Sequence, residues 1–237
     1  GVLMINSSQS SDQPDKTQTQ KIYISLDRMR FEDESGYIAI FRQDKKVFWM
    51  LDDQKKTYTE MTERDLQEMK RTLDEASRQM AEQMKDLPPE QRQMMEAMMA
   101  GKMTQKAPEI VYQKVASGER IGSWVCDKYE GSSEGKKKSE VWTTDWQQLD
   151  LKSSDFQVLK EMGEFFARLA PEATSFYPME ESSEKSVYSG VPVKTISYSD
   201  DMASRTSELK ELRTEEFNAA LFELPAEYKK EALGMQP

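Results

Sequence analysis

Strand-like runs joined by short polar loops constrain the fold of this chain more than any other feature. After residue 20, apolar and polar residues alternate in successive runs, and Glu, Asp, Gln, Lys and Gly dominate the separators. Loops this short join neighbouring antiparallel strands, because parallel strands need a long crossover. The expected strands are residues 22–31, 37–41, 47–51 and 57–61. This part of the chain is therefore predicted to be an antiparallel meander.

Residues 62–101 follow a helical period instead. Thr62 is a good N-cap, and Asp65 stands where the partner of a capping box is found. Apolar residues then recur every three or four positions, which places them on one helix face. They are Leu66, Met69, Leu73, Ala76, Met80, Met84 and Leu87. Pro88 and Pro89 interrupt the stripe, and Pro89 suits the first turn of a second helix. The pattern predicts a helical hairpin.

Strand-like runs return after Pro108, with one helix among them from Ser153 or Ser154 to Leu169. Ser117 and Gly118 are expected to form a turn. The expected strands are residues 110–117, 120–130, 137–145, 191–199, 203–214 and 222–224. Short connections and segregated helices predict an α+β fold, with a mainly antiparallel sheet and helices packed on one face.

The first twenty residues look unlike the rest of the chain. Residues 6–20 are nearly all Ser, Gln, Thr, Asp and Lys, a composition that buries too little apolar surface to order itself. We expect residues 1–20 to form a disordered polar tail and residues 21–237 a single domain. Such a tail resembles the tether of an exported protein whose signal was removed. An ordinary cytosolic N-terminus or a cloned fragment is the alternative.

Composition excludes several classes of function. The net charge of −10 argues against nucleic acid and against anionic membranes as partners. No apolar run approaches the ~20 residues of a transmembrane helix. The absence of His rules out Ser-His-Asp catalysis and His-based zinc sites, and no glycine-rich phosphate motif occurs. The single Cys126 is expected to be a small strand residue. We predict no enzyme activity, no metal site and no cofactor.

Methionine is concentrated in and next to the predicted hairpin: nine of the sixteen lie in the stretch from Met61 to Met103. Met is unbranched and polarizable, so it fits irregular apolar partners. The pair Met94 and Met98 lies one helical turn apart, on one face. Three interpretations stay open: core or interface packing, the lining of a site for an apolar ligand, and Cu(I) binding through thioether sulfur.

Aromatic residues mark one predicted strand. Alternation places Trp142, Thr144 and Trp146 on one face, with Thr143 and Asp145 on the other. Trp142 is either an aromatic anchor between sheet and helix or a wall of a ligand cavity, since buried Trp commonly dominates core packing.

Several local patterns follow the order found in an uncharacterised family of bacterial exported domains. They are residues 47–52 with 56–61, 87–91, 124–129, 140–146, 190–193 and 222–228. That family is similar in layout to the periplasmic lipoprotein carriers and their outer-membrane acceptors (LolA/LolB-like). The resemblance implies a curved sheet forming an incomplete β-barrel, with the Met-rich hairpin and a further helix on its concave face. It also implies a periplasmic or outer-membrane-anchored protein, and it transfers no catalytic or binding residue.

These observations favour a non-enzymatic cell-envelope protein that binds a lipid or acyl chain between sheet and helices. The expected cavity residues are Met69, Met80, Met84, Met94, Met98 and Trp142. A structural or protein-interaction module with a filled interior and an envelope partner is the alternative. Cu(I) handling through Met is a minor one.

Overall fold

The structure is a computed structural model that describes residues 1–85, 110–167, 188–199 and 202–233. In these residues the strands form one twelve-stranded sheet in the order β12-β6-β5-β4-β3-β2-β1-β11-β10-β9-β8-β7. The strands are β1 (Val2–Ser10), β2 (Gln13–Ile24), β3 (Arg28–Asp33), β4 (Tyr37–Arg42), β5 (Val47–Asp52), β6 (Thr57–Thr62), β7 (Val111–Ile121), β8 (Trp124–Ser133), β9 (Lys136–Thr144), β10 (Val191–Ser199), β11 (Met202–Thr214) and β12 (Lys229–Lys230).

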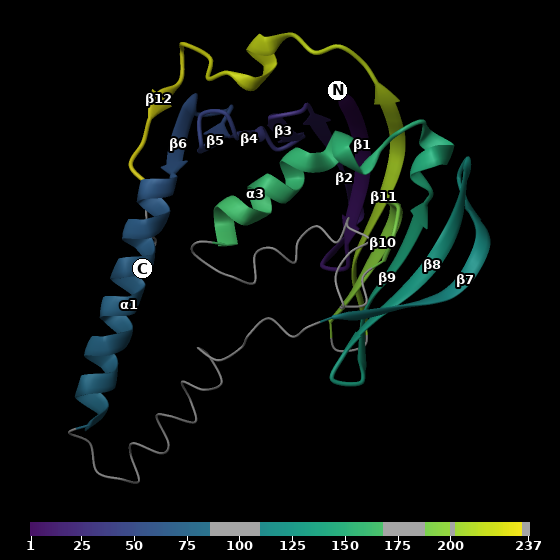
Figure 1. Cartoon of the computed structure of the whole chain (residues 1–237), viewed down its shortest axis with the longest axis horizontal. Helices are drawn as coiled ribbons and strands as arrows, with labels where there is room; N and C mark the ends of the chain where they lie inside the picture. Colours follow the sequence, from purple (N-terminus) through teal and green to yellow (C-terminus); the bar gives the residue numbers. More distant parts are fainter. Residues whose placement is uncertain (86–109, 168–187, 200–201, 234–237) are drawn as a thin grey trace.

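The sheet is antiparallel at each junction except the short β12–β6 pair, which is parallel. It bends strongly between β2 and β10, so that β7, β8 and β9 turn away from the layer formed by β3 to β6 (Figure 1). The bend leaves a concave side, across which helix α3 (Gln157–Ala167) runs. The predicted curved, open antiparallel sheet with helices is therefore confirmed.

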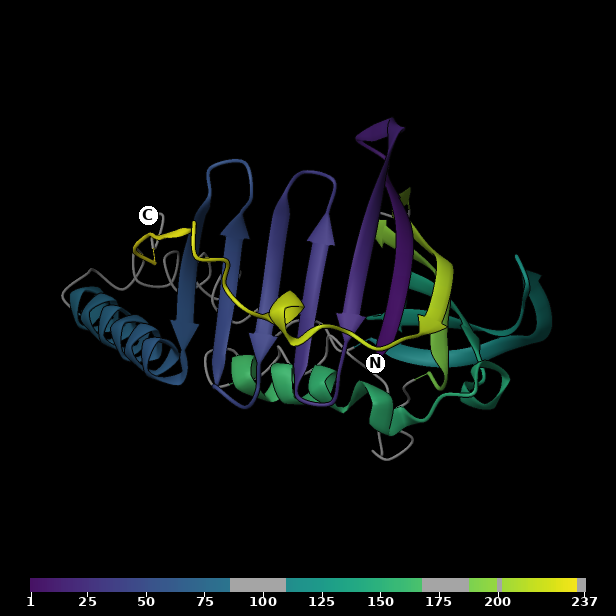
Figure 2. The ribbon, with the colours of Figure 1, turned by 90° about the horizontal axis from the view of Figure 1, so that it is seen from above.

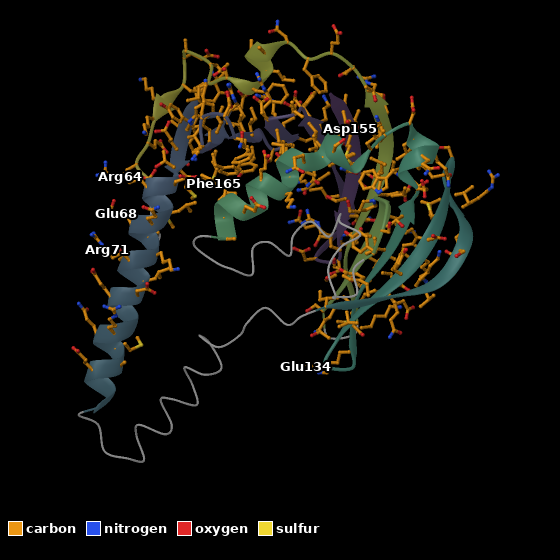
Figure 3. All side chains as sticks on the ribbon, viewed as in Figure 1. Arg64, Glu68, Arg71, Glu134, Asp155 and Phe165 are labelled. Atoms are coloured by element: carbon orange, nitrogen blue, oxygen red, sulfur yellow. The ribbon has the colours of Figure 1, made fainter. Side chains whose placement is uncertain are left out.

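Two apolar cores lie on opposite faces of the β3–β6 layer. On the concave side α3 buries Val158, Leu159, Met162 and Phe165, the last of which is labelled in Figure 3. The centres of the Phe165 and Phe41 rings lie 5.5 Å apart. On the outer side the C-terminal stretch, in yellow, crosses the strands (Figure 2). Its 3-10 helix η4 (Ala219–Phe222) places Phe222 among the buried outer-face residues Ile40, Trp49 and Leu51.

The predicted meander is confirmed closely in its later strands. β4, β5 and β6 begin where the alternation places them, and β5 buries every second residue. The run 22–31 instead holds two strands, because residues 25–27 form a tight reversal between β2 and β3. Leu26 lies at that reversal, 77% exposed, although its place in the alternation suggested a strand interior.

The prediction of a disordered tail over residues 1–20 is wrong. β1 pairs on one side with β2 and on the other with β11, so its backbone groups are hydrogen-bonded along both edges. Val2, Leu3 and Met4 are buried. The polar residues that follow are ordered by backbone hydrogen bonds to both neighbouring strands rather than by burial of their side chains. Amino-acid composition does not reveal such pairing.

Two smaller predictions are also wrong. Ser117 and Gly118 lie inside β7, where the register shifts between Ala116 and Glu119, and the reversal comes at residues 122–123. Gly118 has φ +77°, so it supplies a β-bulge rather than a turn. Residues 222–224 do not form a strand, since η4 occupies 219–222 and is capped by Asn218, which accepts a 2.9 Å bond from the Ala220 amide.

The helix α1 (Glu63–Lys85) is buried against the sheet at its first turn. Leu66 is fully buried, whereas Leu73 is 55% and Met80 42% exposed. The helix projects from the end of β6, with Arg64, Glu68 and Arg71 directed away from α3 (Figure 3). Packing of a Met-rich hairpin on the concave face is not confirmed, because the residues predicted to form its second helix lie outside the described residues.

The start of α1 carries the predicted capping box. The Asp65 carboxylate accepts a 2.8 Å bond from the Thr62 amide, and the Asp65 amide donates to Thr62 Oγ1 at 3.3 Å.

Thr62→Ala is expected to lower the free energy of unfolding by about 1 kcal/mol, the usual effect of losing a cap. Urea denaturation measures this loss of stability. Thr59→Ala, on the same strand but outside the cap, is the control, and an equal loss in both variants would contradict a capping role.

Within the described residues, none of the helices combines the length and apolar character needed to cross a membrane.

Candidate functional site

A cavity of about 250 Å³ lies on the concave side of the bend, bordered by β1, β2, β3, β10, β11 and α3. Most of its wall is apolar. The apolar lining includes Met4, Ile22, Ile24, Met29, Leu159 and Leu209. The α3 residue Leu159 closes the side opposite the sheet, so the cavity lies between sheet and helix.

Strand register explains why these side chains converge. Ile24 pairs with Val2 and with Met29, and Ile22 pairs with Met4 and with Phe31. Directly paired residues point to the same face of an antiparallel sheet. Two apolar rows therefore cross β1, β2 and β3 side by side. They form the apolar floor of the cavity.

The floor becomes polar further along β1. Asn6, Thr195 and Ser207 line the cavity from three adjacent strands, β1, β10 and β11. Ser207 pairs directly with Thr195, and Asn6 pairs with Leu209, two residues from Ser207. The three side chains are half-buried. The cavity thus has an apolar end near α3 and a polar end away from it.

Lys194 also borders the cavity, but its ammonium group lies over the Trp142 ring. Its ammonium sits 5.4 Å from the centre of the Trp142 ring, and Lys194 pairs with Trp142 across β9 and β10. The next residue, Thr195, lines the cavity with Ser207. Successive residues of a strand point to opposite faces, so the Lys194 side chain faces away from the polar end of the cavity.

One tyrosine ring borders the cavity, and it packs against two tyrosines of β7 and β8. Tyr188 belongs to the lining, and its ring packs edge-on against Tyr112 at 5.0 Å and near Tyr129 at 6.2 Å. Tyr112 is held in turn by Ser139, whose hydroxyl donates to the Tyr112 hydroxyl at 3.1 Å. Edge-to-face packing of this kind fixes ring positions. The cavity therefore has one wall with a defined shape.

A second hollow, on the outer face of the sheet, is polar and already occupied by ion pairs. Arg30 binds Glu32 at 3.0 Å, and the Tyr23 hydroxyl donates to the same carboxylate at 2.9 Å. Burial, followed by the bond to Glu32, raises the pKa of Tyr23 to about 12. Because the Arg30 and Glu32 charges already bind each other, we take the concave cavity as the candidate site.

The predicted cavity residues do not meet at the described cavity. Met69 is half-buried and Met80 exposed on α1, and only the backbone of Met84 is described. Met94 and Met98 lie outside the described residues. The cavity role of Met84, Met94 and Met98 stays a prediction, and so does Cu(I) binding through Met94 and Met98.

Trp142 is buried as part of the apolar core that includes the α3 residues, but it does not line the cavity. The Lys128 and Lys194 ammonium groups lie 4.7 and 5.4 Å from its ring centre. Its indole N–H donates to the Glu119 carboxylate at 2.5 Å. Contact with two cations holds the ring in place among residues of the sheet.

Sequence reasoning missed the methionines that do line the cavity, Met4 and Met29. The alternation of Ile22 and Ile24 was the available signal, because the partners of these two residues across the sheet must share their face. Met4 gives no such signal, because it lies just before the polar stretch whose composition predicts a tail.

No group of three or more Asp, Glu, His or Cys residues is placed to hold a metal ion in the described part of the chain. Cys126 is buried, and this burial raises the pKa of its thiol. A thiol in that state is a poor nucleophile and ligand.

Comparison with known proteins adds a family and a partial structural likeness. No match is found among curated proteins. An uncharacterised conserved protein from Thermus thermophilus has a structure similar to this one with a TM-score of 0.49 and 9% sequence identity, over 98% of this chain and 89% of that chain. Residues 76–228 match the model of a domain of unknown function, DUF4412. The resemblance to an uncharacterised domain family is thereby confirmed, and the chain belongs to the DUF4412 family.

Proposed function

We propose that this protein is a non-enzymatic binder of an apolar ligand, a lipid or an acyl chain, in the cell envelope. The observation that carries the proposal is the cavity between the curved sheet and α3, with an apolar floor built from β1, β2 and β3. The envelope location rests on the family resemblance of the motifs. Fractionation of cells that produce the natural full-length protein tests that location.

The size of the cavity sets the kind of ligand. Its volume of about 250 Å³ exceeds the ~150 Å³ of an apolar cavity that accepts benzene and falls below the ~300 Å³ where sites for drug-sized ligands begin. A single acyl chain is narrow enough to enter such a space, whereas a fused-ring lipid needs more width. The proposal is therefore restricted to ligands with one slender chain.

Filling the cavity tests the proposal. Ile22 is a half-buried lining residue, and Ile22→Trp places a large ring in the space that the acyl chain would occupy. We expect the affinity for a fluorescent single-chain fatty acyl probe to fall at least tenfold, measured by titration of detergent-free protein. Val115→Trp, a substitution on β7 at a side chain that is 49% exposed, is the control and should bind like the unmodified protein.

Two results would contradict the proposal. One is a natural protein that binds no acyl probe and carries no copurified lipid in native mass spectrometry. The other is equal binding by the Ile22 and Val115 variants, which would locate the probe away from this cavity. Urea denaturation of both variants shows whether Ile22→Trp keeps its fold.

A further inference from the structure

We propose that the cavity selects single-chain amphiphiles with an uncharged, hydrogen-bonding end, such as a fatty alcohol, over fatty-acid anions. This inference rests on the proposed function and names the ligand class of the same site. Three features of the cavity support it: the separation of its apolar and polar ends, the hydrogen-bonding groups at the polar end, and the position of the lysine that borders it.

The two ends of the cavity fix how an amphiphile would lie. Ile24 and Met29 stand at the end near Leu159 of α3, and Asn6 and Ser207 stand at the other end of the same floor. A hydrocarbon chain gains most from contact with the first pair. The polar group of the ligand then falls beside the second pair, two sheet rows along the strands.

The polar end has hydrogen-bonding capacity available for a ligand. The side chains of Asn6, Thr195 and Ser207 make no hydrogen bond to another side chain or backbone group among the described residues. An amide and two hydroxyls supply both donors and acceptors. A ligand hydroxyl or amide can pair with them in either direction, so its desolvation is compensated.

The described residues place no countercharge for an anion at the polar end. Among the described lining residues Lys194 is the only cation, and its ammonium lies over the Trp142 ring on the opposite face of β10. An ionised carboxylate in this cavity would lose water without gaining a charged partner, which costs far more than burying a hydroxyl that finds its bonds. The cavity therefore discriminates against the anion.

Decanol and decanoate share a chain length and test the inference directly. At pH 8, isothermal titration calorimetry with the full chain should give an affinity for decanol at least tenfold higher than for decanoate. Asn6→Leu with Ser207→Ala should weaken decanol binding about tenfold, because the hydroxyl loses its partners. Ser7→Ala, which alternation places on the other face of β1, is the matched control and should leave decanol binding unchanged.

The outcomes separate the inference from the proposed function. Decanoate binding as tightly as decanol, with this binding lost in Lys194→Met, would overturn the inference and leave the acyl-binding function standing. Equal binding of both ligands that Lys194→Met does not change would overturn it too. Failure of both ligands and of the acyl probe to bind would overturn the function and the inference together.

Discussion

Phe222→Ala is expected to lower the free energy of unfolding by about 3–5 kcal/mol, the range for removal of a fully buried aromatic ring. The Phe222 side chain is 1% exposed and stands among buried outer-face residues of the sheet. Its ring also meets the Phe217 ring at 5.9 Å, and its carbonyl accepts a 3.3 Å bond from the Arg42 guanidinium. The loss of the ring leaves a cavity under the C-terminal stretch, and urea denaturation monitored by Trp fluorescence measures its cost.

A matched control separates burial from substitution itself. Leu26→Ala removes an apolar side chain that is 77% exposed, and its effect should stay within about 0.5 kcal/mol. A loss below about 1 kcal/mol in the Phe222 variant would show that the C-terminal stretch does not cover the sheet as described.

Glu140→Gln is expected to lower the free energy of unfolding by about 3 kcal/mol at neutral pH, the equivalent of the pKa shift of this carboxyl group. The carboxylate is 9% exposed and binds the Lys128 and Lys137 ammonium groups at 2.8 and 2.6 Å and the Tyr198 hydroxyl at 2.6 Å. Burial alone would raise the pKa of Glu140, but the three hydrogen bonds outweigh it and lower this pKa from 4.5 to about 2.

The contribution of Glu140 to stability is expected to depend on pH. Because the pKa of Glu140 is lower in the folded chain than its ordinary value of 4.5, its contribution is complete above pH 4.5 and is lost as the pH falls toward 2. The natural protein should therefore lose stability over this interval, and the Gln variant should lose less. The two stability curves, from urea denaturation at a series of pH values, should converge near pH 2.

Glu130→Gln is the control, because it removes a carboxylate that is ion-paired but exposed. Glu130 contacts Lys137 at 3.2 Å, but its side chain is 42% exposed, so water screens the pair and the expected effect is below about 1 kcal/mol. Equal effects of the two substitutions at neutral pH, or parallel pH profiles for the natural protein and the Glu140 variant, would contradict a special contribution of the buried carboxylate.

The elements that were predicted well are those whose nature is visible in a local pattern of apolar and polar residues. Strands β4 and β5 are largely apolar runs bounded by short polar loops, because one face of this layer meets α3 and the other meets the C-terminal stretch. The start of α1 was predictable because a capping box is a local device, complete within Thr62 and Asp65. Both signals arise within a few residues, so no knowledge of distant partners is needed.

What the sequence could not supply depends on distant partners. The strand β1 is ordered by pairing with β11, at the other end of the chain, and its polar residues carry no sign of it. The cavity forms where register brings Asn6, Thr195 and Ser207 from three strands together. Met80 illustrates the same limit on a helix. It belongs to an apolar stripe, yet its side chain is exposed, because the spacing of apolar residues does not identify the surface that covers them.

The position of β1 has a consequence for how the chain folds. Val2 pairs with Thr214, and the Gly1 ammonium donates to the Glu215 carbonyl at 2.9 Å. The free edge of β1 is therefore covered by β11, which lies about 200 residues further along the chain. Contacts of such high sequence separation slow folding. During synthesis the β2–β6 layer can assemble early, but it joins β7–β10 only through the β1–β11 pair of the described sheet. Until β11 emerges, β1 presents an open edge, which makes the nascent chain prone to strand exchange between copies.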